Sequence, residues 1–258
     1  MKITLLGTGT SVGIPSLGQL GWGKCNPQNP KNNRQRCAVL IQSNNTNILI
    51  DAGPDIKNQL IGHNLPSLDG IIITHEHADH ISGLDELRPF YFPKQEKINI
   101  YTVERTANFL STRFDYLFNK NEKSQSYFKP PMNLNIINYY DEINFNDIHI
   151  KTIKQHHGVI DTIGLIINDK FAYCTDVVDF PDDSFNKLKN LDTLVITGLR
   201  STPHIAHAHF DLTFSWINKL KPKKAYLTHL SPDSDHDSVL SICPDNVEPA
   251  YDNLYFNI

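Results

Sequence analysis

The chain has 258 residues, of which 40% are hydrophobic and 10% aromatic, and its formal net charge is −4. This length and composition predict an ordinary globular protein, and no apolar run approaches the length of a membrane span. The negative charge excludes an overall basic field that would attract nucleic acid or anionic lipid, although a local basic patch would still suffice for RNA.

Strands and helices are predicted to alternate along the first half of the chain. Short apolar runs bounded by turn residues predict strands at Ile3–Leu6, Cys37–Gln42, Asn47–Ile50 and Leu68–Thr74. Helical spacing or a capping residue predicts helices at Asp55–His63, with Asp55 as the cap, and at Leu84–Arg88 and Val103–Phe118. A Gly-rich turn from Gly7 to Gly13 leads into a Gly/Pro/Asn-rich loop from Ile14 to Gln35, and Asn119–Pro131 is expected to form a mobile loop or lid.

The second half repeats this pattern of strands and helices. Strands are predicted at Ile148–Ile153, Thr162–Ile167, Phe171–Cys174, Thr193–Thr197 and Lys224–Thr228, and helices at Pro181–Leu188, Asp211–Leu220 and Asp235–Ile242. Two strand-rich halves, each followed by helices, predict an α/β (α+β) protein, a four-layer αββα sandwich of two mixed β-sheets with helices outside. Because no linker or short-period repeat divides the sequence, we expect residues 1–258 to form a single domain.

The most informative segment is His75-Glu76-His77-Ala78-Asp79-His80. Three imidazoles and a carboxylate in six residues are difficult to explain by packing. The preceding strand would hold them rigidly, as a preorganised metal site requires. Four ligands exceed what one tetrahedral ion with an open position takes from a single segment, so we infer two ions. The alternative is a solvated polar loop or a single weak metal clip.

Three other predicted strands also end in metal-ligand side chains. His156 and His157 follow one strand, Asp176 follows the next but one, and His229 ends another. A lone histidine at a strand end is usually a surface residue, and a lone aspartate usually forms a turn. Together with the histidine motif, these strand ends predict one shared metal site.

This set of residues resembles the metallo-β-lactamase fold superfamily. The order is Asp51, the His75–His80 motif, His157, Asp176 and His229. A narrower resemblance, to the branch similar to phosphoribosyl 1,2-cyclic phosphate phosphodiesterase, is carried by five segments: Gly7–Pro15, Asn29–Arg36, Asp79–Arg88, His157-Gly158 and Val247–Asp252.

The resemblance implies how the ligands are divided between two ions. His75, His77 and His157 would bind one ion, Asp79, His80 and His229 the other, and Asp176 would bridge them because a carboxylate has two oxygens. Asp51 would orient a ligand rather than bind a metal. His157 is chosen over His156 because the family has a His-Gly pair and because neighbouring strand residues point to opposite faces. Nitrogen and oxygen ligands suit Zn²⁺, Mn²⁺ or iron, with zinc or manganese expected.

A second histidine cluster spans Pro203–Asp211. In phosphodiesterases of this superfamily, such a histidine protonates the leaving oxygen, which an imidazole does near neutral pH. A Pro-His-x-x-His pattern points to His207 and a His-x-Asp-Leu pattern to His209, and we favour His207 slightly. The alternative is that Asp211 caps a helix and the histidines form its exposed lead-in.

The Ile14–Gln35 loop and its neighbouring cysteines give two further expectations. Arg34 or Arg36 would either pair with a substrate phosphate or form a salt bridge that fixes the loop. Relatives with an additional structural zinc have closely spaced cysteines here, whereas only Cys25 and the distant Cys37 are present, so we expect no such zinc site. Separated cysteines and a first apolar stretch too short for a signal peptide indicate a reducing compartment, and we expect a cytoplasmic protein.

The expected function is a metal-dependent phosphodiesterase that hydrolyses a small, cyclic or nucleotide phosphodiester through water activated by two ions, with Asp79 and His207 or His209 at the catalytic centre. The alternatives are a tRNA 3′-end processing endonuclease, a thioester, lactone or β-lactam hydrolase, and a non-catalytic metal or nucleotide binder. A small molecule is the expected partner. Nucleic acid is less favoured because the net charge is acidic, no membrane partner is expected, and a homodimer stays open.

Overall fold

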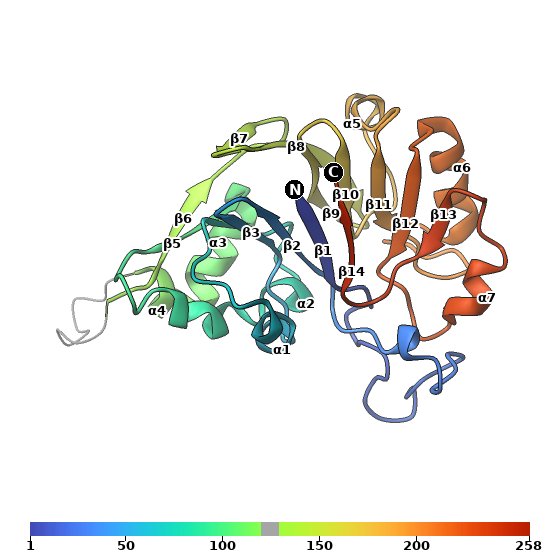
Figure 1. Ribbon diagram of the computed structural model, residues 1–258, viewed down its shortest axis with the longest axis horizontal. Coiled ribbons are helices and arrows are strands. Elements are labelled where there is room, and N and C mark those ends of the chain that lie inside the picture. The colour runs from blue at the N-terminus through green and yellow to red at the C-terminus, as the bar shows by residue number, and fades with distance from the viewer. Residues whose placement is uncertain (120–128) are drawn as a thin grey trace.

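The computed structural model describes residues 1–119 and 129–258 and contains two seven-stranded sheets (Figure 1). The central part of the expected lid, residues 120–128, lies outside the described residues. The first sheet has the order β14–β1–β2–β3–β4–β5–β6, with the bounds Leu254–Asn257, Lys2–Gly7, Ala38–Ser43, Thr46–Ile50, Gly70–Ile72, Ile98–Thr102 and Met132–Ile136. The second has the order β13–β12–β11–β10–β9–β8–β7, with the bounds Val247–Pro249, Lys224–Thr228, Thr193–Thr197, Phe171–Cys174, Ile160–Ile167, Ile148–His157 and Glu142–Phe145.

Both sheets are mixed, and they follow the same plan. In the first sheet β14, β1, β2 and β3 pair antiparallel, whereas β3, β4, β5 and β6 run parallel. In the second sheet β7, β8, β9 and β10 pair antiparallel, whereas β10, β11, β12 and β13 run parallel. The two sheets are therefore built alike, with the crossover helices between their parallel strands.

Alternating side chains of single strands show that each sheet is apolar on both faces. On β3, Ile48 and Ile50 join the cluster between the sheets, whereas Leu49 joins the cluster under the helices. On β10, Phe171 belongs to the cluster between the sheets and Ala172 to the opposite one. Because successive strand residues point to opposite faces, these runs of apolar residues make a layer buried on both sides. The predicted αββα sandwich is confirmed.

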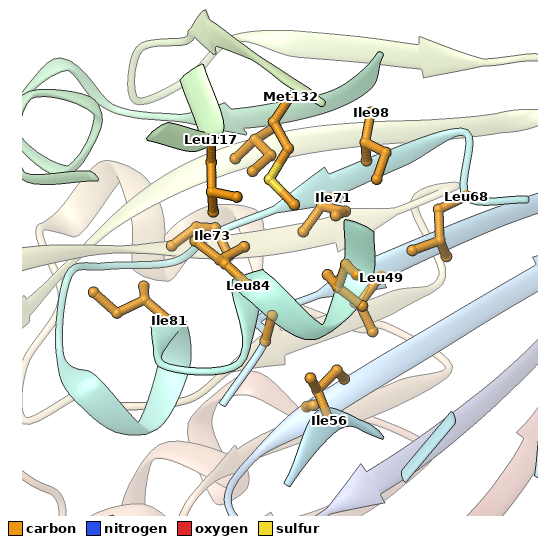
Figure 2. Close-up of a cluster of buried hydrophobic side chains, with 14 of the residues drawn as sticks. Leu49, Ile56, Leu68, Ile71, Ile73, Ile81, Leu84, Ile98, Leu117 and Met132 are labelled. Carbon is orange, nitrogen blue, oxygen red and sulfur yellow. The ribbon is translucent and has the colours of Figure 1, made fainter. Parts of the chain in front are cut away.

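Helices cover the outer face of each sheet. Beside the first sheet lie α1, α2, α3 and α4, with the bounds Ile56–Leu60, Ala78–Ile81, Glu104–Arg113 and Asp115–Phe118, and the 3₁₀ segments η2 and η3 at Ile61–His63 and Leu84–Phe90. Figure 2 shows side chains of these helices, such as Ile81 and Leu117, in the same buried cluster as Leu49 and Ile71 of the sheet. On the second sheet, α5, α6 and α7 span Asp182–Lys187, Phe210–Leu220 and His236–Leu240. The remaining 3₁₀ helix, η1, spans Pro30–Asn32 in the N-terminal loop.

Several predicted elements differ from the observed ones. The expected helix Val103–Phe118 is two helices, because the backbone leaves the helical region at Phe114. Asp55 precedes α1, but its side chain makes no capping bond there, since it instead accepts a hydrogen bond from the backbone N–H of Arg36. The expected helix Leu84–Arg88 is a 3₁₀ helix that continues through Pro89.

Five strands were not predicted from the sequence: β5, β6, β7, β13 and β14. Three of them alternate buried or half-buried residues with polar ones, as in Asn133 and Asn135 of β6. The other two are short, at three and four residues, and lie at the edges of the sheets. In the part of the chain that the structure describes, no helix combines the length and apolar character needed to cross a bilayer.

Candidate metal centre

The candidate ligands lie at or just beyond the ends of strands from both sheets. His157 is the last residue of β8, Asp51 and His229 directly follow β3 and β12, and Asp176 comes two residues after β10. Asp51, Asp176 and His229 all have a positive φ, at 62°, 53° and 57°. This left-handed conformation is uncommon outside glycine, and aspartate and histidine are among the residues that adopt it more readily. Such strained positions cluster at functional sites, where the surrounding structure holds them in place.

One group consists of three histidines from two distant segments. His75 Nε2 lies 3.0 Å from His77 Nδ1, and His157 Nε2 lies 3.2 Å from the same His77 atom. His75 and His157 are buried, whereas His77 is exposed. The group is therefore open to solvent on the side of His77, as a site that must admit a small molecule requires.

A second group consists of Asp79, His80, Asp176 and His229, which are all buried. His80 Nε2 lies 3.2 Å from Oδ2 of Asp79 and 3.2 Å from Oδ2 of Asp176. His229 Nε2 lies 3.7 Å from Asp79 Oδ2 and 3.3 Å from Asp176 Oδ1. Two imidazole nitrogens therefore face the oxygens of two carboxylates.

Asp176 connects the two groups. Its Oδ1 atom lies 3.7 Å from His157 Nε2 in the first group and 3.3 Å from His229 Nε2 in the second. Its Oδ2 atom accepts a hydrogen bond of 2.7 Å from the hydroxyl of Thr175, which fixes the carboxylate plane. One buried carboxylate is thus shared between two sets of imidazoles.

Hydrogen bonds behind the rings determine which nitrogen of each histidine is free. Asp51 is fully buried, and its Oδ2 accepts from His80 Nδ1 at 2.7 Å. The hydroxyl of Thr74 donates to Asp51 and therefore accepts from His75 Nδ1 at 3.0 Å. With Nδ1 protonated in both rings, the Nε2 atoms carry lone pairs that point into the site, which is the arrangement found around metal-bound histidines.

The free nitrogens fit a pair of divalent ions. His157 Nδ1 donates to the carbonyl oxygen of Ala206 at 2.7 Å, so its Nε2 also presents a lone pair. His80 Nε2 and both ring nitrogens of His229 are buried without a hydrogen-bond partner. Because leaving buried polar atoms unpaired costs about 1–3 kcal/mol each, an ion that binds the Nε2 atoms of His80 and His229 would remove this cost for both atoms. Buried His/Asp groups of this kind are typical of a dinuclear metal site.

The charges of the site are strongly coupled. Burial raises the pKa of Asp176, but His229 and His80 outweigh it and hold that pKa well below its usual value. Burial lowers the pKa of His80, but the carboxylates of Asp79, Asp51 and Asp176 together raise it well above the usual value, so an ion that binds Nε2 would displace a proton from it. The carboxylates are therefore ionised and attract positive charge into the site.

Of the two candidate proton donors, only His207 lies beside these groups. His207 Nδ1 is 3.6 Å from Asp176 Oδ1, and its ring stacks on His229 with 4.6 Å between centroids. His209 precedes α6 as its N-cap residue, and its carbonyl oxygen accepts from the N–H of Thr213. Burial is the main reason that the pKa of His207 is lowered to about 3. Asp211 lies within the first turn of α6 rather than capping it.

The two arginines of the N-terminal loop both have protein partners. Arg34 is fully buried and donates to the carbonyl oxygen of Ser234 at 3.0 Å. Arg36 forms an ion pair of 3.0 Å with Asp55. These two arginines were expected either to pair with a substrate phosphate or to fix the loop, and their contacts support the role of fixing the loop. Cys25 and Cys37 are free, buried thiols.

Three supporting groups were not singled out from the sequence: the hydroxyls of Thr74 and Thr175 and the carbonyl of Ala206. A threonine directly before His75 and another directly before Asp176 were visible as a repeated pattern. The carbonyl of Ala206 left no such signal, because any residue type has one.

Comparison with known proteins agrees with this geometry. The β-lactamase superfamily domain matches residues 46–230. A crystal structure of a diphosphatase from the PhnP family superposes with a TM-score of 0.88 at 31% identity, covering 99% of this chain and 97% of that one. Zn²⁺-bound PqqB from Methylobacterium extorquens superposes with a TM-score of 0.78 at 14% identity, covering 100% of both chains, which shows a shared fold.

Curated relatives are longer than this chain. An octanoyltransferase of Porphyromonas gingivalis is 29% identical over 259 residues, which cover 98% of this chain and 51% of that protein. The anti-Pycsar protein Apyc1 of Bacillus phage vB_BsuM-Goe3 is 36% identical over 88 residues, which cover 33% of this chain and 27% of that protein. The matched residues thus cover about half or less of these relatives. From the matched domain, the fold and the PhnP-family structure, the chain belongs to the β-lactamase superfamily, has the metallo-β-lactamase fold and is related to the PhnP family.

Proposed function

We propose that the protein is a metal-dependent hydrolase that cleaves a phosphodiester at the site shared by the two sheets. The observation that carries this proposal is the position of Asp176, whose two oxygens face histidines of both groups. The similarity to a PhnP-family diphosphatase supports a substrate that contains phosphate. A shared carboxylate is the feature that distinguishes a two-ion site from two separate ones.

In this proposal each group of side chains holds one ion. His75, His77 and His157 would bind the first, Asp79, His80 and His229 the second, and Asp176 both. When bound, the ions supply an activated water and a positive charge beside the phosphate oxygens. Zinc and manganese are both compatible with nitrogen and oxygen ligands, and activity measured with each metal separately distinguishes them.

The residues of the chain have three tasks in the reaction. The hydrogen bonds of Asp51 and Thr74 keep the Nε2 atoms of His80 and His75 directed into the site. Asp79 helps to orient the attacking water. His207 protonates the leaving oxygen. Burial and the neighbouring His229 lower the pKa of His207, and the negative charge of a bound phosphate would raise it again, so His207 would take up its proton together with the substrate.

The first test removes the shared carboxylate. Asp176→Ala should lose one or both ions and its activity on bis-p-nitrophenyl phosphate, measured with Zn²⁺ and Mn²⁺ in separate assays alongside metal content. Rates like those of the wild type would refute the two-ion proposal.

The second test compares two histidines of one loop. His207→Ala should lower kcat by roughly 10²- to 10⁴-fold with both ions retained, as expected for a general acid. The matched control is His209→Ala, two residues away, which should keep wild-type kcat. Equal losses in both variants would rule out His207 as the proton donor. A substrate screen with cyclic ribose phosphates, cyclic nucleotides and precursor tRNA would separate a small-molecule phosphodiesterase from an RNA-processing enzyme.

A further inference from the structure

A pocket of about 590 Å³ lies beside the segments that carry the three histidines, without including the histidines in its lining. Its walls come from the end of β5 and the start of α3, from the β6–β7 connection, and from the turn between β8 and β9. Figure 1 shows that the β6–β7 connection leads from the edge of one sheet to the edge of the other. The pocket therefore lies where the two sheets meet.

Two of these walls are joined directly to metal-site residues. Arg105 Nε lies 2.6 Å from Oε1 of Glu76, the residue between His75 and His77. On the other side, Val159 and Ile160 follow His157 across a single glycine. The pocket is therefore within reach of the remaining atoms of a ligand whose phosphate lies at the three histidines.

The lining is mainly apolar and aromatic. Tyr139 and Ile137 line the pocket together with Val159 and Ile160. Burial raises the pKa of Tyr139 to about 12, and the carboxylates of Asp161 and Glu76 contribute to this shift. Lys154 Nζ lies 5.6 Å from the centroid of the Tyr139 ring and 2.7 Å from Asp161 Oδ2. Lys154 thus lies over one face of a ring that also lines the pocket.

Two apolar side chains beside the site are exposed to solvent. Val159 is 98% exposed and Ile205 is 85% exposed. Their loops touch, because His157 donates to the carbonyl oxygen of Ala206 and a Cβ added at Gly158 would lie 3.1 Å from the Ala206 Cβ. Exposed apolar residues that gather at the edge of a polar site indicate contact with an apolar part of a ligand.

Resting on the hydrolase function proposed above, we infer that this pocket binds the base of a nucleotide, with Tyr139 packing against the base and Val159 covering its edge. A nucleobase has the flat apolar faces that an aromatic lining recognises, and it is attached to a phosphate through a single ribose. The volume is of the size that small-molecule sites have, roughly 300–1,000 Å³. The substrate class is therefore a nucleotide phosphodiester rather than a phosphorylated sugar without a base.

The test compares two ligands that differ only by the base, adenosine 5′-monophosphate and ribose 5-phosphate, by calorimetry on metal-loaded protein. The wild type should bind the nucleotide more tightly by roughly 5- to 150-fold, the range that base–aromatic stacking contributes. Tyr139→Leu, which keeps an apolar side chain without the ring, should lose most of this preference while its affinity for ribose 5-phosphate stays the same. Equal affinities in the wild type, or no binding of the nucleotide, would overturn the inference.

Two further variants separate binding from folding. Val159→Ser changes a fully exposed side chain, so it cannot act through the core, and it should reduce the preference by a smaller factor. Tyr255→Leu, at an exposed tyrosine on the edge strand β14, is the matched control and should keep the wild-type preference. Retention of the full preference in both Tyr139→Leu and Val159→Ser would refute the assigned pocket. Turnover is measured separately, so a protein that binds the base but cleaves no phosphodiester would refute the hydrolase proposal alone.

Discussion

Replacing Asp51 with asparagine should weaken metal binding while changing the shape of the site very little. The Asp51 carboxylate is fully buried and accepts hydrogen bonds on two sides. His80 Nδ1 approaches Oδ2 at 2.7 Å, and the backbone N–H of Thr74 approaches Oδ1 at 2.8 Å. An asparagine amide has one oxygen and one NH₂ group, so it satisfies one side and presents a donor to a donor on the other.

The two possible orientations of the amide in Asp51→Asn lower different quantities, either metal affinity or folding stability. With the NH₂ group toward His80, the ring must move its proton to Nε2, which then no longer binds an ion. Altered partners of ligating histidines typically lower metal affinity by about 10- to 100-fold, or roughly 1.4–2.8 kcal/mol. With the NH₂ group toward Thr74, a buried N–H loses its acceptor, which costs about 1–3 kcal/mol of folding stability. Either metal affinity or stability should therefore fall by this amount.

Both quantities can be measured on the same variant. Zinc affinity is obtained by titration against a competing chelator, and the free energy of unfolding by urea denaturation. The control is Asp69→Asn, because Asp69 accepts one hydrogen bond, of 2.8 Å, from the N–H of Asn47 at the opposite end of the same pair of strands. Asp51→Asn protein with the zinc affinity and stability of the wild type would show that the Asp51–His80 contact does not orient the ligand.

Three other predictions follow from the same structure. Removing metal with a chelator should lower Tm, and returning Zn²⁺ at about 100 times its Kd should restore roughly 2.7 kcal/mol of stability; an unchanged Tm would contradict the buried site. Leu49→Ala, in the core cluster of Figure 2, should cost about 2–5 kcal/mol in urea denaturation, whereas Leu17→Ala at a 97% exposed position should change stability by less than about 0.5 kcal/mol. Gly53→Ala should reduce metal content, because the new Cβ would lie 2.1 Å from the carbonyl oxygen of Asp79; Gly62→Ala, with nothing within 4 Å, is the control, and equal metal content in both would contradict the crowding argument.

Much of the fold followed from local patterns. The hairpin of β2 and β3 and the buried strand β10 carry dense apolar runs, and each was predicted within a few residues. The polar strand β6 was missed because its asparagines hide the alternation that marks a strand. The break at Phe114 was missed because the apolar spacing continues across it.

The sequence by itself determined the chemistry of the site, because side-chain identity and short spacing fix which atoms a loop such as His75–His80 can offer. Only the tertiary structure decided which distant groups meet there. His207 rather than His209 lies against Asp176, and the carbonyl of Ala206 orients His157. These contacts join residues up to 49 positions apart, so they depend on how the two sheets pack and on the path of each loop. Neither is encoded in any single stretch of residues.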